Sequence, residues 1–291
     1  MAAAAFLAFL PQFSFLSAVV SPDNLVIFFS SATLYAACRM ASGAERGKEA
    51  LFLVGLSLLC AAVKEQGIPV LLFALLTLPL LSGRTQFLQL LFNKRLLLIL
   101  ASLVVVWTGA FYLFGNAAAV KRVWTLSQAR FGDFSATFLV PLSVYARFFL
   151  IVFVGFWFSY GWAIYKMSLG WYSVFALVSV MGLLGTMWVF CLTRERTRID
   201  LRCATLALLL FLICFLVMLG VLGPGHEGVQ TRHFAAALPA IAVLLTLGLW
   251  GVTPERYRVE VLQGFILLMV FVNAVVVMKY LIPLFYLGAP A

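Results

Sequence analysis

The sequence predicts an all-α fold, a polytopic transmembrane bundle of about nine spanning helices. Two observations predict it: 65% of the 291 residues are hydrophobic and only 10% are charged, and apolar runs follow one another along the whole chain. Runs of about 17 to 25 apolar residues cross a bilayer as helices. The hydrocarbon core satisfies no backbone amide, and the runs do not alternate as barrel strands do. Residues 1–291 are therefore expected to form a single helical transmembrane domain.

Polar breaks between the apolar runs place the expected spanning helices. The N-terminal run lacks the basic segment that begins a signal peptide, so it is expected to remain as the first helix. The nine predicted segments are 3–20, 24–38, 50–64, 67–83, 96–115, 172–193, 203–222, 235–252 and 260–283. A further apolar block, 137–165, contains Pro141, Arg147 and the aromatic sequence FWFSYGW.

Basic residues orient these helices, because loops rich in lysine and arginine stay on the cytoplasmic side. Four loops are expected to share that side, with Arg39, Arg46, Lys48, Arg84, Lys94, Arg95, Arg194, Arg196, Arg198, Arg202, Arg256 and Arg258. This orientation requires that 137–165 makes no net crossing. The block is therefore expected to be interfacial or re-entrant, within an outer loop at 116–171. Its aromatic residues suit the headgroup level, where amphipathic rings collect: Trp157, Tyr160, Trp162, Tyr165 and Trp171.

The net charge of +10 would suggest a nucleic-acid partner in a soluble protein. Here the basic residues lie in short loops, and no basic face with interleaved aromatic residues is present, so nucleic acid is excluded as a partner. All five cysteines lie within or at the ends of apolar runs and are interpreted as small hydrophobic residues. No pair of them has metal-ligand spacing, so no metal and no cofactor is expected.

Residues 50–83 contain two short apolar runs joined by KEQGIP. Each run is short for a hydrocarbon core about 30 Å thick. Gly67 permits a turn, and Pro69 disfavours a helical conformation for Ile68. A tight hairpin with its apex near the outer boundary of the membrane is therefore predicted.

The hairpin apex holds the first group of candidate binding residues, Lys64, Glu65 and Gln66. Charged groups at membrane depth are costly unless they are paired or wetted, so they mark functional sites. The simpler alternative is a Lys64–Glu65 ion pair that satisfies itself and reaches toward the interface. Both interpretations place the helix break at the same position.

Two further candidates lie beside other expected helices. Asp23 in SPDN lies between the first two helices, and the alternative to a functional carboxylate is an ordinary helix N-cap made by Ser21 or Asp23. The sequence HEGVQTRHF precedes helix 235–252. Arg232 near that helix N-terminus would form an anion site, because the arginine fork and the free backbone amides both favour phosphate. The alternative is a hydrated loop whose charges have no function.

The fourth candidate is the outer segment 116–136, which continues to Arg147. Its charged residues are Lys121, Arg122, Arg130 and Asp133. A basic outer segment could hold a lipid phosphate, although nonspecific contact with lipid headgroups is the simpler interpretation. No Ser/His/Asp order, glycine-rich phosphate loop or inverted repeat is evident.

Four short motifs resemble, in chain order, a family of bacterial membrane proteins related to the C-type glycosyltransferases. They are LPQFSFLSAVVSPDN, VKEQGIPVLL, FVGFWFSYGW and VQTRHFAAALP. The superfamily includes protein O-mannosyltransferases and the aminoarabinose transferase of lipid A. The family's proline-to-aspartate turn matches Pro22 and Asp23, and its hairpin lysine matches Lys64. Arg232 and His233 match an arginine-aromatic pair, with His233 where the family has tyrosine.

This resemblance implies a C-type fold in a bacterial inner membrane and a polyprenyl-phosphate-linked sugar donor for envelope glycan assembly. Transfer to an acceptor would occur on the outer face, with an acidic base activating a hydroxyl and cations stabilising the departing phosphate. The expected substrate-binding residues are Lys64, Glu65, Gln66, Arg147, Arg232 and His233. The base is unassigned among Asp23, Asp133 and Glu227.

One departure from the family favours a different class of function. C-type transferases have their usual catalytic acidic residue in a first outer loop, ahead of the part that matches here. A partner chain that supplies those helices, or a non-catalytic membrane subunit that binds lipid or a partner protein, is therefore an alternative expectation. A transporter or flippase is a third alternative, which would require ordered inverted halves.

Overall fold

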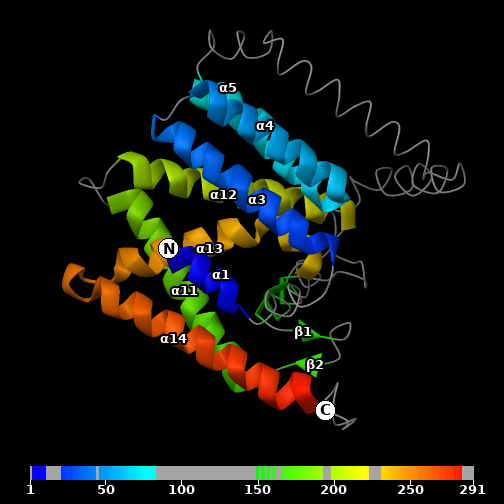
Figure 1. Ribbon diagram of the computed structural model, residues 1–291. Helices are drawn as coiled ribbons and strands as arrows, with labels where there is room; N and C mark the ends of the chain where they lie inside the picture. Colours follow the sequence, from blue (N-terminus) through cyan, green and yellow to red (C-terminus); the bar gives the residue numbers. More distant parts are fainter. Residues whose placement is uncertain are drawn as a thin grey trace, which may run out of the picture.

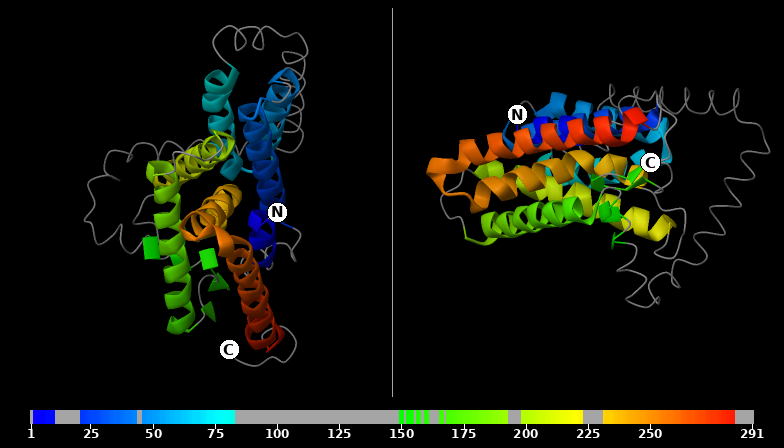
Figure 2. Two further views of the ribbon diagram at one scale, coloured as in Figure 1. Left: turned by 90° about the vertical axis from the view of Figure 1, so that its left-hand side faces the viewer. Right: turned by 90° about the horizontal axis from the view of Figure 1, so that it is seen from below.

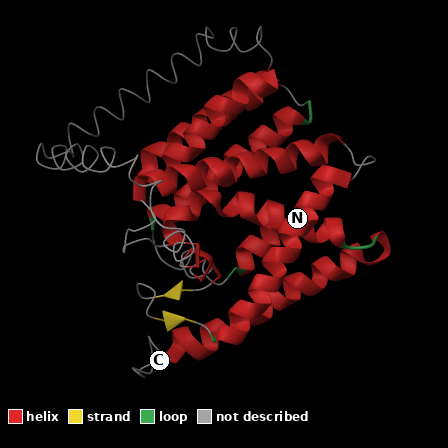
Figure 3. Ribbon diagram, turned by 180° about the vertical axis from the view of Figure 1, so that it is seen from behind, coloured by secondary structure: helices red, strands yellow, loops and turns green. Residues whose placement is uncertain are grey.

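The computed structural model describes residues 2–10, 21–43, 46–82, 168–192, 198–222 and 231–283, with short stretches between 149 and 166. These residues are almost entirely helical, which confirms the all-α prediction (Figures 1 and 3). The helices are α1 Ala2–Phe9, α3 Pro22–Ala41, α4 Arg46–Val63, η1 Glu65–Gly67, α5 Ile68–Ser82, α11 Leu169–Leu192, α12 Arg198–Leu222, η2 Thr231–Ala237, α13 Leu238–Val252, η3 Glu255–Tyr257, α14 Arg258–Val276 and the π-helix η4 Val277–Leu281. Two short strands, β1 Ser159–Tyr160 and β2 Tyr165–Lys166, pair antiparallel.

Four helices among the described residues are long and apolar enough to cross a membrane. They span Pro22–Ala41, Leu169–Phe190, Phe234–Val252 and Glu255–Lys279, and two shorter apolar helices span Glu65–Leu81 and Arg202–Val217. The predicted segment 96–115 lies outside the described residues, and 3–20 is described only to Leu10. The count of about nine crossings stays a prediction.

The outward faces of these helices are apolar. In the most apolar stretches of Leu169–Phe190 and Glu255–Lys279, only 28% and 22% of the residues are buried inside the protein. Large side chains such as Leu183, Met187, Leu267 and Phe271 point outward and are more than half exposed. A helix that is hydrophobic on all sides requires an apolar surrounding. The structure is therefore consistent with an integral membrane protein.

The helices run between two ends of the bundle, at the left and right of Figure 1. Helices α11 and α13 are parallel, because Gly182 lies against Leu245 and Val189 against Gly251. At the N-terminal end of α12, Arg202 Nη1 donates a hydrogen bond to the Ala41 carbonyl, 2.8 Å away at the C-terminal end of α3. The ends of α3, α11 and α13 and the starts of α4, α12 and α14 thus share one end.

We call this the basic end, because it holds Arg39, Lys48, Arg202, Arg256 and Arg258. The predicted orientation required these loops to share a side, and the described loops do so. Helix α5 also ends there, whereas α11 begins at the opposite end (Figure 1). If 96–115 spans the membrane and 137–165 makes no net crossing, the predicted topology requires α5 to end and α11 to begin at opposite ends of the bundle. Which end faces the cytoplasm stays a prediction.

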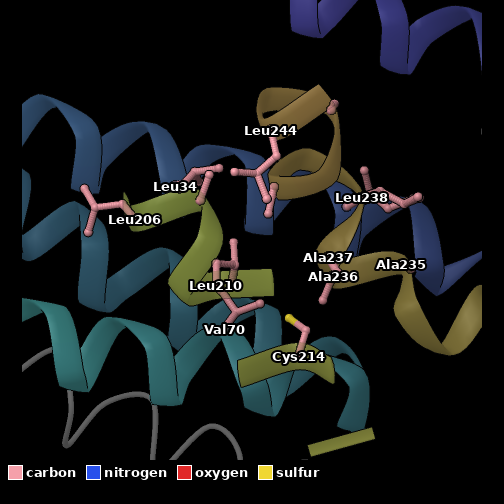
Figure 4. Packing of buried hydrophobic residues seen from close by; sticks show 14 of the residues in the cluster. Leu34, Val70, Leu206, Leu210, Cys214, Ala235, Ala236, Ala237, Leu238 and Leu244 are labelled. Carbon is pink, nitrogen blue, oxygen red and sulfur yellow. The ribbon is translucent and has the colours of Figure 1, made fainter. Parts of the chain in front are cut away.

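The core lies where α3, α5, α12, η2 and α13 meet. Figure 4 shows Leu34, Val70, Leu210 and Cys214 among the buried side chains of this core, together with the alanine run of η2. Ala235, Ala236 and Ala237 are almost completely buried. Small side chains let this segment approach α3 and α12 closely, as in other membrane helix contacts.

Helix α13 lies between α11 and α14 in both views of Figure 2. Glycines line the crossing where α13 contacts α11. A Cβ atom on Gly185 would overlap the Gly248 carbonyl, and one on Gly248 would overlap the Gly182 carbonyl. Thr186 Oγ1 donates a hydrogen bond to the Leu244 carbonyl, 2.9 Å away across the same interface. The two helices are therefore in backbone contact.

Trp157 corrects one expectation about the aromatic block. Its ring is completely buried, stacks on Phe175 with ring centroids 4.4 Å apart, and meets Phe6 of α1 edge-on. Burying an aromatic ring against other rings stabilises a core more than exposure at an interface does. Trp157 therefore belongs to the protein interior and not to an exposed headgroup belt. The rest of 137–165 is described only in pieces.

Candidate functional site

The first component of the candidate site is the start of α3. Ser21 is its N-cap: the backbone is extended there, and the hydroxyl oxygen accepts a hydrogen bond from the Asp23 amide at 3.3 Å. Pro22 occupies the first turn, where its missing amide hydrogen is tolerated. Capping is therefore done by Ser21, as one sequence-based alternative held. The Asp23 carboxylate is left for a different contact.

The second component is the break between α4 and α5, which confirms the predicted position of the helix break. Ile68 is helical and begins α5, so the expectation that Pro69 keeps it out of a helix is wrong. Helix α4 ends at Val63, Lys64 is extended with φ −163° and ψ 152°, and η1 turns the chain into α5. Gly67 closes the turn against α4, since a Cβ atom there would overlap the Cys60 carbonyl. The close approach explains why the turn requires glycine.

An ion pair joins these two components. Lys64 Nζ lies 2.6 Å from Asp23 Oδ1, and the two side chains are 26% and 4% exposed. Nearby, the Cys60 thiol donates a long hydrogen bond, 3.5 Å, to the Val26 carbonyl and ties α4 to α3. Lys64 thus pairs with Asp23, and the expected alternative of a Lys64–Glu65 pair is wrong. Glu65 is exposed at the outer side of the turn.

The third component is η2, which packs against both η1 and α3. The Ser30 hydroxyl donates a short hydrogen bond to the Ala236 carbonyl and fixes η2 to α3. Arg232 and His233 form the first turn of η2, and their side chains lie outside the described part of the chain. Gln66 is only 1% exposed. Three segments that the sequence singled out separately therefore meet at the end opposite the basic end.

We call this meeting point the Asp23–Lys64 site, made of Asp23, Lys64, Gln66 and the first turn of η2. An ammonium group has three N–H donors, and Asp23 Oδ1 accepts one of them. Because Lys64 is partly exposed, its other donors can reach an anionic ligand. Asp23 is nearly inaccessible and already paired, so it is poorly placed to take a proton from a substrate.

Several predicted residues fall outside the described residues, and the structure neither joins them to the site nor separates them from it. They are Asp133, Arg147 and Glu227. Within the described part of the chain, no group of three or more His, Cys, Asp or Glu side chains could hold a metal ion.

Comparisons with protein-family models, with curated proteins and with solved structures found no match to this chain.

The close turn at Gly67 yields a first test. Gly67→Ala is expected to lower the free energy of unfolding by about 1 to 3 kcal/mol, the usual cost of overpacking, because α4 and η1 must separate. Gly55→Ala, in α4 with nothing within 4 Å of a new Cβ, is the matched control and should be neutral or slightly stabilising. Thermal unfolding in detergent micelles measures both. Equal midpoints for the two variants would contradict the tight turn.

Proposed function

We propose that this chain is a membrane glycosyltransferase-like protein of C-type architecture, with about nine crossings, that handles a polyprenyl-phosphate-linked sugar in envelope glycan assembly. In this proposal the Asp23–Lys64 site faces the outer side of a bacterial inner membrane and receives the lipid phosphate. The cations assigned to that phosphate are Lys64, Arg232 and Arg147. The base that activates the acceptor is unassigned among Asp23, Asp133 and Glu227, and the Asp23 side chain is only 4% exposed.

One observation supports this function best: η2, whose first turn contains Arg232 and His233, packs against the turn that holds Lys64. Two cations from distant parts of the sequence thereby belong to neighbouring segments. Two neighbouring cations are suited to a phosphate. The expected hairpin break at the same place also supports the resemblance on which the sugar donor rests.

A non-catalytic subunit that binds lipid or a partner protein is the second candidate. The observation that favours it is the burial of Asp23, because a 4% exposed carboxylate paired to lysine suits a structural contact as well as a chemical one. This candidate predicts lipid binding without transfer. A transporter finds less support, since it requires inverted halves.

Lipid-phosphate binding tests the proposal. Arg232→Ala is expected to weaken the binding of a polyprenyl phosphate to purified protein in zwitterionic nanodiscs by about 1.5 to 3 kcal/mol, roughly 10- to 150-fold, the range for a hydrogen bond to a charged group. Arg256→Ala is the matched control at the basic end and should bind like the wild type. Equal affinities for all three proteins would remove the phosphate site.

Transfer separates the two candidates. Membranes that contain the protein would be supplied with a radiolabelled polyprenyl-phosphate sugar and an acceptor extract. Label that moves to the acceptor, and does not move with Arg232→Ala, supports the transferase. Tight binding with no transfer under any acceptor supports the non-catalytic subunit.

A further inference from the structure

We propose that Asp23 is an intramolecular counter-ion that competes with the lipid phosphate for Lys64, so that the site binds its ligand by exchanging one anion for another. This inference rests on the proposed function, because it concerns the same phosphate site. It assigns Asp23 a regulatory role in binding and not the role of a base.

The geometry of the pair points to exchange. Asp23 is held in place by the capped first turn of α3 and is 4% exposed. Lys64 has an extended backbone between two helices, and its side chain is 26% exposed. Its flexible four-carbon stem lets the ammonium turn while the backbone stays fixed. The mobile partner of the pair is therefore the cation, and it is the partner that can reach a ligand.

Charge explains why competition matters. A Lys64 ammonium paired with Asp23 is nearly neutral and attracts phosphate weakly, whereas an unpaired ammonium attracts it strongly. A polyprenyl-phosphate sugar is a phosphodiester with one negative charge, and the polyprenyl phosphate left after transfer carries about −1.5 to −2 at pH 7. Without a competing carboxylate, Lys64 would retain this product more tightly than the donor. Asp23 thus favours product release.

Two further titratable residues belong to segments beside the pair. Glu65 follows Lys64 directly and is exposed, and Arg232 belongs to the segment that packs against η1. Glu65, being exposed, is screened by water and competes less with Asp23. The competition is therefore assigned to Asp23.

The test uses the full chain in zwitterionic nanodiscs with polyprenyl phosphate as the probe. Asp23→Asn is expected to tighten binding about fivefold to tenfold, and Lys64→Gln to weaken it about tenfold or more. Asp23→Asn should have no further effect when Lys64→Gln is already present. Asp23→Ser, a smaller neutral replacement, should tighten binding in the same way.

The outcomes separate this inference from the proposed function. Binding that requires Lys64 but is unchanged or weakened by both Asp23 variants overturns the counter-ion and leaves the phosphate site. Binding that is absent from the wild type, or indifferent to Lys64→Gln, overturns the phosphate site and the counter-ion with it.

Discussion

Replacing Lys64 by methionine is expected to lower the free energy of unfolding by about 3 to 5 kcal/mol, the usual cost of removing one partner from a buried ion pair. The reason is the location of Asp23, whose side chain is only 4% exposed. Methionine keeps the apolar stem of lysine but removes the ammonium group that lies 2.6 Å from the buried carboxylate. Equilibrium unfolding in mixed detergent micelles, followed by tryptophan fluorescence, measures the change.

Removing the charge of the other partner, Asp23, should destabilise the protein less. Asp23→Asn is expected to cost about 1 kcal/mol, because Lys64 is 26% exposed and can turn its ammonium toward water. The double variant with Lys64→Met should recover much of the loss, since neither charge then remains buried. Arg39→Met, which removes a half-exposed cation from the basic end, is the control and should change little. If Lys64→Met proved no more harmful than Asp23→Asn, the carboxylate would not depend on this lysine.

The hairpin and the basic end could be predicted from the sequence because the signals are local. Gly67 is next to the helix break, and the chain turns from Val63 into α5 at that position. Pro69 lies in the first turn of α5, and Ile68 before it is helical. Lysine and arginine residues in short loops orient helices without any tertiary contact. Predictions of this kind need only neighbouring residues. From α3 onward, the ends of the described helices lie within a few residues of the predicted ends.

The partner of Lys64 could not be predicted in the same way. Asp23 lies 41 positions earlier in the chain, and nothing local indicates which of several polar groups a lysine at a turn will meet. The adjacent Glu65 was the nearest opposite charge, but η1 directs it outward. The packing of α4 on α3 decides the pairing, and that packing depends on small contacts such as that of Cys60 with Val26.

The burial of Trp157 shows the same limit for aromatic residues. Tryptophan near a membrane boundary is frequent at the headgroup level, so composition alone favours that position. The structure instead stacks this ring on Phe175 and sets it against Phe6 from the first helix. The distinction depends on α1, which meets α13 and α14 although it is far from Trp157 in the sequence.

A sequence signal was available for the crossing of α11 with α13. Each helix contains two glycines three residues apart, in GLLG at 182–185 and GLWG at 248–251. Small residues at such spacing let membrane helices approach to backbone contact, where weak Cα–H···O contacts add to the packing. The glycines of these two motifs face one another in the structure.

This crossing leads to the second large expected effect. Gly248→Leu is expected to lower the free energy of unfolding by about 3 kcal/mol or more, at the upper range of overpacking. A Cβ atom at position 248 would already overlap the Gly182 carbonyl, and the rest of a leucine side chain has no space between the two backbones. The helices must therefore separate, which also breaks the hydrogen bond from Thr186 to the Leu244 carbonyl.

Gly264→Leu is the matched control, because Gly264 is in the neighbouring helix α14 with nothing within 4 Å of a new Cβ. It should be neutral or slightly stabilising, since leucine favours a helix more than glycine does. Gly248→Ala should fall between the two leucine variants. Separation of α11 from α13 can be read directly from a spin-label pair at exposed positions 183 and 252, whose distance should increase with Gly248→Leu and stay constant with Gly264→Leu. A distance unaffected by Gly248→Leu, or equal loss of stability in both leucine variants, would mean that the glycines do not hold these helices in contact.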